Sequence, residues 1–252
     1  MKWMAALVLV FGFAFANPEG SPNQKQPTLS DRNKPWIAQN GGTKQWLKRY
    51  WEQNAEFNRM KSAELVFVGD SLTDFWSSMG KPVWQKEFRG MKVANAGISA
   101  DRTQQMVFRM MNGTATNLKP KGYVVMGGTN NLAMNSPDSP ADVAKGIEGI
   151  VRAVQQKTPT AQILVLSILP NSADPDLALR IQKTNELLKD RMSALKKVRF
   201  LNLWEDFSAG DGKLKIDLTV DGTHLTEKGY ELLADKIRPN LHNWLGMNKD
   251  IF

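Results

Sequence analysis

Cysteine is absent from the 252-residue chain, and histidine occurs only twice. The lack of cysteine excludes disulfides, thiolate metal sites and a cysteine nucleophile. With two histidines and no His-Glu-x-x-His sequence, the chain also lacks the ligands of a typical zinc site. We therefore expect no metal ion to take part in its function.

Three sequence motifs that define large enzyme classes are also missing. No Gly-x-Ser-x-Gly occurs, which excludes the nucleophile elbow of the α/β-hydrolases. Neither of the glycine-rich phosphate-binding motifs, Gly-x-x-x-x-Gly-Lys-[Ser/Thr] and Gly-x-Gly-x-x-Gly, is present, so nucleotide use is not indicated.

Long apolar runs are missing everywhere except at the N-terminus. Residues 1–16 carry a single charge, Lys2, followed by an apolar run that ends in Ala-Phe-Ala. This run is shorter than the roughly 20 residues that a membrane span needs, and it is typical of a secretory signal peptide. We predict cleavage after Ala16, a secreted or periplasmic protein and no stable membrane insertion. Residues 17–41 form a polar, proline-rich segment, and 42–252 are expected to form one domain.

Positive charge exceeds negative charge, with 33 Lys and Arg against 25 Asp and Glu and a formal charge of +8. Most of these cations are dispersed along the predicted helices. The one dense cluster, Lys196, Lys197 and Arg199, leads into a predicted strand and has no interleaved aromatic residues. The charge therefore indicates a solvated basic surface and no nucleic-acid partner.

Short buried-type runs alternate with amphipathic patterns along the chain. The runs predict strands at 64–68, 92–94, 123–126, 163–167 and 198–203, and the clearest helical patterns lie at 43–61, 141–156, 175–195 and 226–244. Strands that alternate with helices form a parallel sheet covered on both faces. In such α/β sheets ligands bind beyond the carboxyl ends of the strands.

Polar and glycine-rich clusters follow four of the predicted strands. The first holds Ser71, the second Gly97, the third Asn130, and the loop after the fifth holds Asp221 and His224. Each cluster alone also fits an ordinary turn or helix cap. The predicted topology, however, brings all four to one edge of the sheet. His242, on the last predicted helix, is expected to be structural.

These residue types together predict acyl transfer. Ser71 would be the nucleophile, His224 the base that takes its proton, and Asp221 the group that orients the imidazole. The backbone N–H of Ser71, the backbone N–H of Gly97 and the side-chain amide of Asn130 would donate to the oxyanion.

The same residues resemble the SGNH, or GDSL, family of esterases and lipases. The similar stretches are 67–72, 128–131, 163–170 and 221–226, in the right order, and they resemble most the platelet-activating-factor acetylhydrolase catalytic-subunit-like branch. The resemblance spans about 46–244. It implies a three-layer α/β/α sandwich with a five-stranded parallel sheet, a flavodoxin-like (SGNH hydrolase) fold. Two positions depart from the family pattern: Asn131 replaces a common Asp, and Ala100 stands where many relatives have a second glycine.

The resemblance implies a serine ester hydrolase, without cofactor, that removes small acyl groups, above all acetyl, from carbohydrate or lipid alcohols. A lipase, a lysophospholipase and a thioesterase are the alternatives within the fold, and a carbohydrate-binding module without catalysis is the alternative outside it. Specificity is expected to lie in the loops 132–140 and 171–175. A homodimer is left open by the sequence.

Overall fold

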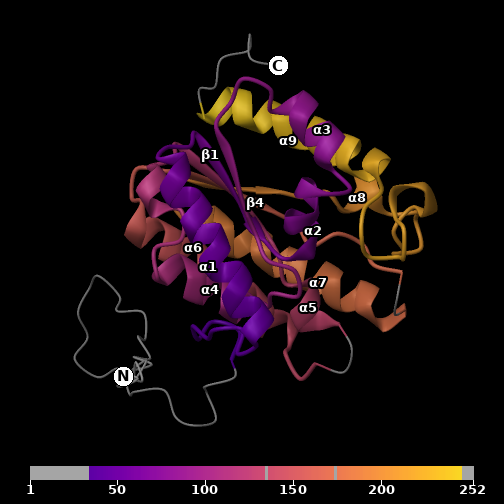
Figure 1. The fold of residues 1–252 in the computed structure, drawn as a ribbon. Helices are drawn as coiled ribbons and strands as arrows, with labels where there is room; N and C mark the ends of the chain where they lie inside the picture. The colour runs from indigo at the N-terminus through magenta and orange to yellow at the C-terminus, as the bar shows by residue number, and fades with distance from the viewer. Residues whose placement is uncertain (1–33, 134–135, 173–174, 246–252) are drawn as a thin grey trace, which may run out of the picture.

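The computed structural model describes residues 34–133, 136–172 and 175–245 (Figure 1). The predicted signal peptide, 1–16, lies outside these residues, as does most of the 17–41 segment. The strands are β1 (Leu65–Gly69), β2 (Val93–Gly97), β3 (Gly122–Met126), β4 (Gln162–Leu166) and β5 (Val198–Leu201). The α-helices are α1 (Lys44–Met60), α2 (Ser71–Asp74), α3 (Lys81–Glu87), α4 (Thr103–Met111), α5 (Thr129–Leu132), α6 (Pro140–Lys157), α7 (Pro175–Ser193), α8 (Trp204–Phe207) and α9 (Glu227–Leu245).

The five strands form one parallel sheet in the order β2-β1-β3-β4-β5. β2 lies on one side of β1, and β3, β4 and β5 lie on the other. The direction in which the sheet is built therefore reverses at β1, and this switch point is the position where α/β sheets bind their ligands. Gly69 at the end of β1 is level with Gly97 of β2 and with Met126 of β3. The segments that follow these three strands thus begin at the same height along one edge of the sheet.

Helices cover both faces of the sheet and make three layers, as the resemblance implied (Figure 1). Side chains alternate between the faces along each strand. Val66 and Val68 of β1 pack with the hydrophobic faces of α4, α6 and α7, whereas Leu65 and Phe67 pack with α3, α8 and α9. All five residues of β1 are buried, as expected for a strand covered on both sides.

β2 is longer than its hydrophobic pattern suggested. The sequence placed residues 95–97 in a loop after the strand, but the structure includes them in β2. The side chain of Asn95 stabilises this polar end of the strand: its Oδ1 accepts a hydrogen bond from the Gly97 N–H, and its Nδ2 donates to the Asp74 carbonyl. Such a tertiary stabilisation leaves no signal in hydrophobic periodicity.

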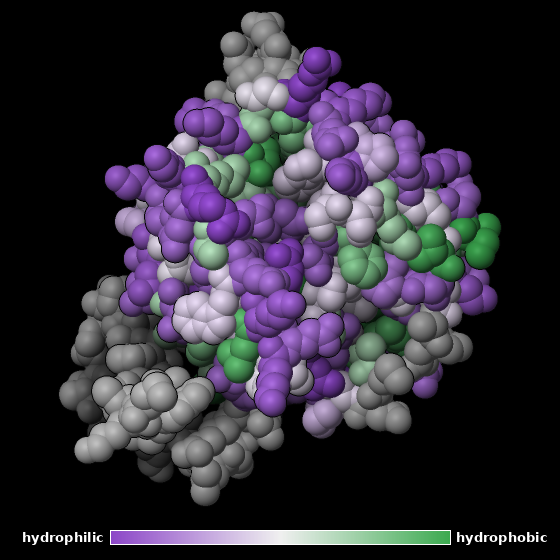
Figure 2. All heavy atoms as spheres, viewed as in Figure 1, coloured by the Kyte–Doolittle hydropathy of each residue, from purple (hydrophilic) through white to green (hydrophobic). Residues whose placement is uncertain are grey.

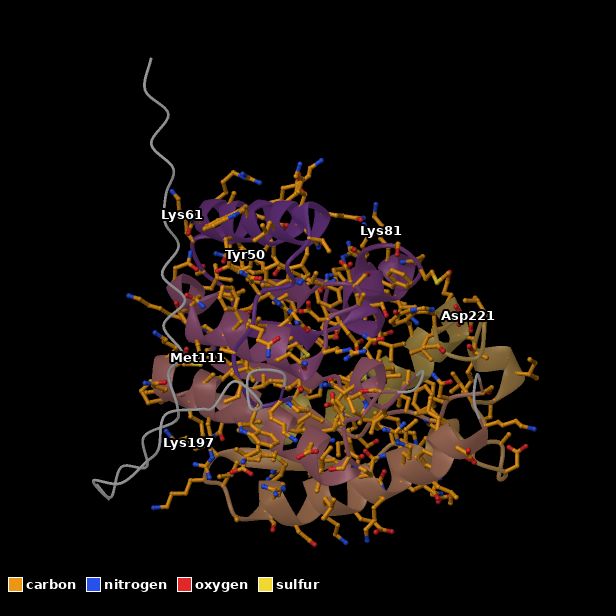
Figure 3. The ribbon with its side chains drawn as sticks, turned by 90° about the horizontal axis from the view of Figure 1, so that it is seen from below. Tyr50, Lys61, Lys81, Met111, Lys197 and Asp221 are labelled. Carbon is orange, nitrogen blue, oxygen red and sulfur yellow. The ribbon has the colours of Figure 1, made fainter. Side chains whose placement is uncertain are left out.

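The carboxyl ends of the strands lie at one side of the molecule. Figure 3 shows Asp221 at the opposite end from Lys61, Met111 and Lys197, which lie near the amino ends of the strands. The surface in Figure 2 is largely hydrophilic, with hydrophobic side chains scattered among the polar ones. Over the ranges 34–133, 136–172 and 175–245, no helix combines the length and apolar character that crossing a membrane requires.

Candidate active site

Ser71 lies immediately after β1, at the switch point, and is the first residue of α2. Asp70 caps this short helix: its Oδ1 accepts a hydrogen bond of 3.1 Å from the Leu72 N–H. The buried Tyr230 hydroxyl donates to the Leu72 carbonyl at 2.9 Å and holds the same turn from α9. Because Ser71 begins the helix, its own N–H has no acceptor inside it and stays at the helix N-terminus.

Ser71, His224 and Asp221 form one chain of hydrogen bonds. The Ser71 Oγ lies 2.9 Å from the His224 Nε2, and the His224 Nδ1 lies 2.7 Å from the Asp221 Oδ2. The structure thus brings Ser71 together with two residues that follow it about 150 positions later in the sequence. With Asp221 on Nδ1, the imidazole is held in the tautomer whose Nε2 can accept the serine proton.

The loop that carries Asp221 and His224 is braced by its own hydrogen bonds. The Thr219 Oγ1 donates to the His224 carbonyl at 2.8 Å, and the Gly222 N–H donates to the Thr219 Oγ1 at 2.9 Å. Phe75, in the 3₁₀-helix η2 (Phe75–Ser77), packs against the His224 ring, with 5.0 Å between the two ring centroids. The side chains of His224 and Asp221 nevertheless remain 26% and 51% exposed.

Asp221 is held in its ionised form by its partners. Desolvation raises the pKa of this carboxyl, but hydrogen bonds from the His224 ring and from the backbone N–H groups of His224 and Thr223 outweigh it and lower the pKa to about 2. Asp221 therefore carries a negative charge at neutral pH and favours the imidazolium that forms when His224 takes a proton.

Asp70, next to the nucleophile, has the opposite environment. It is buried, and within the described parts of the chain its Oδ2 has no hydrogen-bond partner. Desolvation raises the pKa of this carboxyl to about 7, against the lowering effect of the Leu72 N–H. Two carboxyl groups near the same serine thus differ in pKa, because one is buried and the other is more exposed and accepts more hydrogen bonds.

Asn130 and Asn131 follow β3 on α5 and have different roles in the structure. One Asn130 Nδ2 hydrogen donates to the Asp101 carbonyl at 2.8 Å, which leaves the second amide hydrogen for a ligand. Asn131 is fully buried: its Oδ1 accepts from the Thr103 N–H at 2.8 Å and its Nδ2 donates to Asp138 at 2.9 Å. Asn131 therefore fastens α4 to the 132–140 loop, while Asn130 binds the backbone at the end of the 98–101 turn.

The structure gives the N–H of Gly97 a partner other than an oxyanion. It donates to the Asn95 Oδ1 at 2.9 Å. A Cβ at Gly97 would lie 2.2 Å from the backbone nitrogen of Asp74, so glycine is required here for the close approach of α2 to β2. The predicted donor role of Gly97 therefore does not fit its surroundings; the residue is a packing position.

Ala100, which the sequence marked only as a departure from the family pattern, was not among the predicted oxyanion donors. It is exposed, lies in the turn 98–101 that an Asp101 N–H to Ile98 carbonyl bond closes, and has a φ of 64°. Alanine rarely takes this left-handed conformation, in which glycine is unstrained. The glycine that relatives have at this position was the one available signal. In the described chain the Ala100 N–H has no hydrogen-bond acceptor.

The two loops predicted to set specificity contact the site region. The Arg180 guanidinium of α7 donates to the carbonyls of Leu132, Ser136 and Asp138 and holds the first loop. In the second loop the Asn171 amide donates to the Thr223 Oγ1 at 2.8 Å, and the Ser172 N–H donates to the Gly222 carbonyl at 2.8 Å. Residues 134–135 and 173–174 of these loops lie outside the described residues.

Across the described ranges, no group of three or more His, Asp or Glu side chains is placed to hold a metal ion. The arrangement around Ser71 comprises a serine hydroxyl, an imidazole oriented by a carboxylate, a helix N-terminus and a side-chain amide. Together these groups can deprotonate a nucleophile and stabilise negative charge on an attacked carbonyl oxygen.

The chain is similar in sequence to proteins that are named as acylhydrolases. A sequence model of the GDSL-like Lipase/Acylhydrolase family matches residues 67–232. The alpha2 subunit of platelet-activating factor acetylhydrolase IB from Homo sapiens is 34% identical over 171 residues, which cover 68% of this chain and 72% of that protein.

Solved structures share the fold at lower identity. A GDSL-like lipase from Bacteroides thetaiotaomicron superimposes with a TM-score of 0.66 at 23% identity, over 77% of this chain and 96% of that one. A carbohydrate esterase family 3 protein from Talaromyces cellulolyticus superimposes with a TM-score of 0.56 at 17% identity, over 73% of this chain and 98% of that one. The chain therefore belongs to the GDSL-like lipase and acylhydrolase family and is a carboxylic ester hydrolase.

Proposed function

We propose that hydrolysis proceeds through an acyl-serine intermediate on Ser71. The Ser71 Oγ attacks the ester carbonyl while the His224 Nε2 takes its proton, and the protonated imidazole then gives that proton to the departing alcohol. Water, deprotonated by the same Nε2, attacks the acyl-serine and releases the acid and the free serine. The observation that carries the proposal is the continuous hydrogen-bond chain from Ser71 through His224 to Asp221.

Three donors stabilise the tetrahedral oxyanion in this mechanism. They are the Ser71 N–H at the start of α2, the second amide hydrogen of Asn130 and the Ala100 N–H. Ala100 replaces Gly97 in the predicted set because the Gly97 N–H already donates to Asn95, whereas the N–H of the exposed Ala100 has no acceptor among the described residues. Ala100 follows β2 and Ser71 follows β1, and the ends of these strands are level.

Replacing Ser71 with alanine tests the mechanism. The variant is expected to fold normally, because the side chain is partly exposed and donates to no structural acceptor, and to lose p-nitrophenyl acetate hydrolysis by about 10⁴-fold or more. Hydrolysis should be measured beside the circular dichroism spectrum of each protein. Activity at the wild-type level in a folded Ser71→Ala protein would remove Ser71 from the mechanism.

The proposed substrate is an ester of a small acyl group, with acetyl first. The support is the similarity to proteins named as acetylhydrolases. We expect rates on p-nitrophenyl esters to fall steeply from acetyl to octanoyl. Measuring the acid released from a panel of substrates then identifies the alcohol component of the ester. The panel consists of acetylated xylan, pectin, sialic acid and peptidoglycan, together with lysophospholipid.

One surface feature favours a lipid ester as the second candidate. Ile216 and Val220 are 87% and 53% exposed, and they lie on the same segment as Asp221 and His224. Exposed apolar side chains next to a catalytic group suit contact with an acyl chain or a lipid surface. Octanoyl ester hydrolysis as fast as acetyl hydrolysis, abolished by Ile216→Ser with Val220→Ser, would replace the acetylesterase proposal with the lipase.

Export is the third part of the proposal and rests on residues 1–16. The mature protein is then expected to begin at Asn17. N-terminal sequencing of protein from the culture medium and from the periplasmic fraction tests this and separates the two locations. A protein that keeps Met1 and stays in the cytosolic fraction would contradict export.

A further inference from the structure

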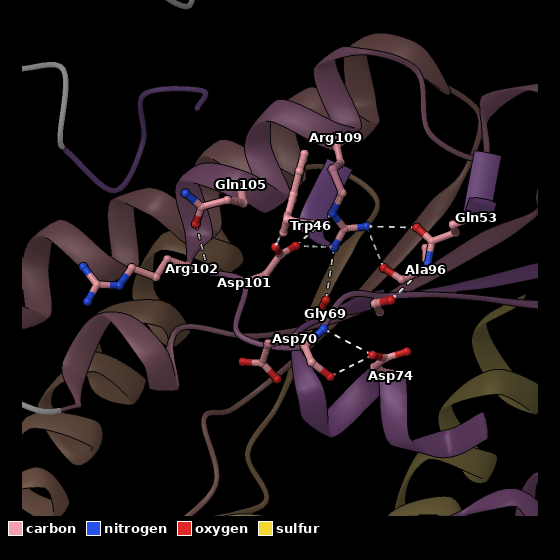
Figure 4. A network of polar contacts seen from close by, with 12 residues as sticks. Trp46, Gln53, Gly69, Asp70, Asp74, Ala96, Asp101, Arg102, Gln105 and Arg109 are labelled. Carbon is pink, nitrogen blue, oxygen red and sulfur yellow. Dashed lines mark hydrogen bonds and ion pairs between the residues drawn. The ribbon is translucent and has the colours of Figure 1, made fainter. Parts of the chain in front are cut away.

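The 98–101 turn is fixed by contacts on both sides of Ala100. Ala100 itself offers only an exposed backbone with a φ of 64°. The orientation of its N–H therefore depends on how Ser99 and Asp101 are held. Each of these neighbours is bound by a separate polar cluster, and both clusters receive a side chain from α1. Figure 4 shows Asp74 at one cluster, and Asp101 with Trp46 and Arg109 at the other.

The first cluster is built on Asp74. Its Oδ2 accepts hydrogen bonds from the Ser99 N–H at 3.2 Å and from the Ser99 Oγ at 2.7 Å, and its Oδ1 receives the Arg49 guanidinium at 3.0 Å. Asp74 is the last residue of α2, and Ser71 is the first. One carboxylate thus ties the helix of the nucleophile to the turn of the oxyanion donor, and Arg49 holds that carboxylate in place.

The second cluster is built on Asp101 and is buried. Its Oδ1 accepts from the Trp46 indole N–H at 2.6 Å, and its Oδ2 accepts from the Arg109 Nε at 2.8 Å. The Asp101 backbone carbonyl receives the Asn130 amide at 2.8 Å. Arg109 also donates to the carbonyls of Ala96 and Gly69 and so connects this cluster to the ends of β1 and β2.

α1 contributes to both clusters from one face. Trp46, Arg49 and Gln53 are spaced three and four residues apart, which places them in a row along the helix. Gln53 extends the row by donating to the carbonyls of Asn95 at 3.2 Å and Gly97 at 3.0 Å, at the open edge of β2. Yet α1 precedes the 67–232 segment that the family model matches.

We propose that α1 is part of the active site: Arg49, acting through Asp74, and Trp46, acting through Asp101, are positioning residues that hold the Ala100 N–H at the oxyanion. The inference rests on the proposed function, since it assumes that Ser71 is acylated and that Ala100 is a donor. If the Ala100 N–H is displaced, its hydrogen bond to the oxyanion of the transition state weakens, whereas binding of the substrate in the ground state is unchanged. A loss of positioning should therefore lower kcat and leave KM unchanged.

Arg49→Ala tests the Asp74 cluster, with Lys48→Ala as its matched control. The Arg49 side chain is 33% exposed, so the variant is expected to fold, and Lys48 is an exposed neighbour that pairs with Glu52. We expect kcat for p-nitrophenyl acetate to fall about 10-fold with KM within about twofold, and affinity for a trifluoromethyl ketone analogue to fall by the same factor. Arg49→Lys should recover part of the loss, and Lys48→Ala should match the wild type.

Trp46→Phe tests the Asp101 cluster, with Trp51→Phe as its control. The change removes the indole N–H and keeps an aromatic ring beside Tyr50; Trp51 is 65% exposed. We expect the same joint loss of kcat and analogue affinity, of about 10-fold, in Trp46→Phe alone.

The inference is overturned if both variants lower the thermal midpoint but keep wild-type kcat and analogue affinity, because α1 would then act on stability only. It is also overturned if KM rises with kcat unchanged. Failure of the proposed function looks different: Ser71→Ala would then retain ester hydrolysis whatever the α1 variants do.

Discussion

The two halves of the proposed active site are held in different ways. The nucleophile half, comprising Ser71, Asn130 and the 98–101 turn, follows β1, β2 and β3 and is fixed by buried groups, including the fully buried Arg109 and Asp101. The general-base half, Asp221 and His224, lies on an exposed loop before α9. It is held by hydrogen bonds within the loop and by contacts with Asn171 and Ser172.

Because of this difference, we expect substitutions in the general-base half to affect activity without affecting stability, and substitutions in the nucleophile half to affect both. Buried charged groups that lose a partner destabilise the fold, whereas exposed groups can be truncated at little cost in stability. We therefore expect general-base variants to lose activity alone, and substitutions among the buried groups of the nucleophile half to cost stability.

The largest expected effect is that of His224→Ala. Removal of the base should lower kcat for p-nitrophenyl acetate by about 10⁴-fold, with the free energy of unfolding within about 0.5 kcal/mol of the wild type. Ester assays and urea denaturation measure the two quantities. The other histidine provides the control, since His242→Ala should keep its activity. A large loss of stability in His224→Ala would break the distinction between the halves.

Arg109→Met probes the buried half. It leaves the Asp101 carboxylate in the interior without its cation, which typically costs about 3–5 kcal/mol in the free energy of unfolding. Urea denaturation of this variant should be compared with Arg59→Met, an exposed arginine on α1 for which we expect a change within about 0.5 kcal/mol. Equal stabilities of the two variants would mean that the buried network does not support the fold.

Asn130→Ala and Asn131→Ala sharpen the comparison at adjacent positions. Loss of the oxyanion donor in Asn130→Ala should lower kcat by about 100- to 1000-fold with little change in stability. Asn131→Ala leaves the buried Thr103 N–H and Asp138 without their partner, so it should cost about 1–3 kcal/mol in stability and change kcat only a few-fold. Identical effects of the two variants on kcat would contradict the assignment of Asn130 alone to the site.

The effect of Asp70→Asn is expected to be zero on the nucleophile–base chain itself and to be seen only as a change in the pH dependence of stability. The folded pKa of Asp70 is raised to about 7 from the ordinary 3.8, so its favourable contribution is present below pH 3.8 and is lost as the pH rises toward 7. The stability of the wild type relative to Asp70→Asn should therefore fall with increasing pH, by about 1 kcal/mol per unit in this window. Urea denaturation at pH 4, 5, 6 and 7 checks it; a pH-independent difference would place the pKa of Asp70 near its ordinary value.

Sequence patterns predicted the five strands and the longest helices, and they predicted that Ser71, His224 and Asp221 lie close together. These predictions were possible because the strands and the clusters after them have local sequence signals. Short apolar runs mark the strands, and parallel topology carries the residues after them to one edge. The roles proposed for Gly97 and Ala100 depend instead on which backbone N–H a side chain already binds, here the Gly97 N–H, which donates to the Asn95 Oδ1 two residues earlier. The contacts of Trp46 and Arg49 join residues 25 to 55 positions apart and have no local signal.

The row of side chains on α1 also bears on where the functional unit of this protein begins. A chain shortened to the matched segment 67–232 would retain Ser71, Asn130, Asp221 and His224. It would lack the indole and the guanidinium that bind Asp101 and Asp74, and the amide that covers the open edge of β2. If the α1 variants behave as proposed, the boundary of the family-model match falls inside the functional unit, and the unit itself starts at or before α1.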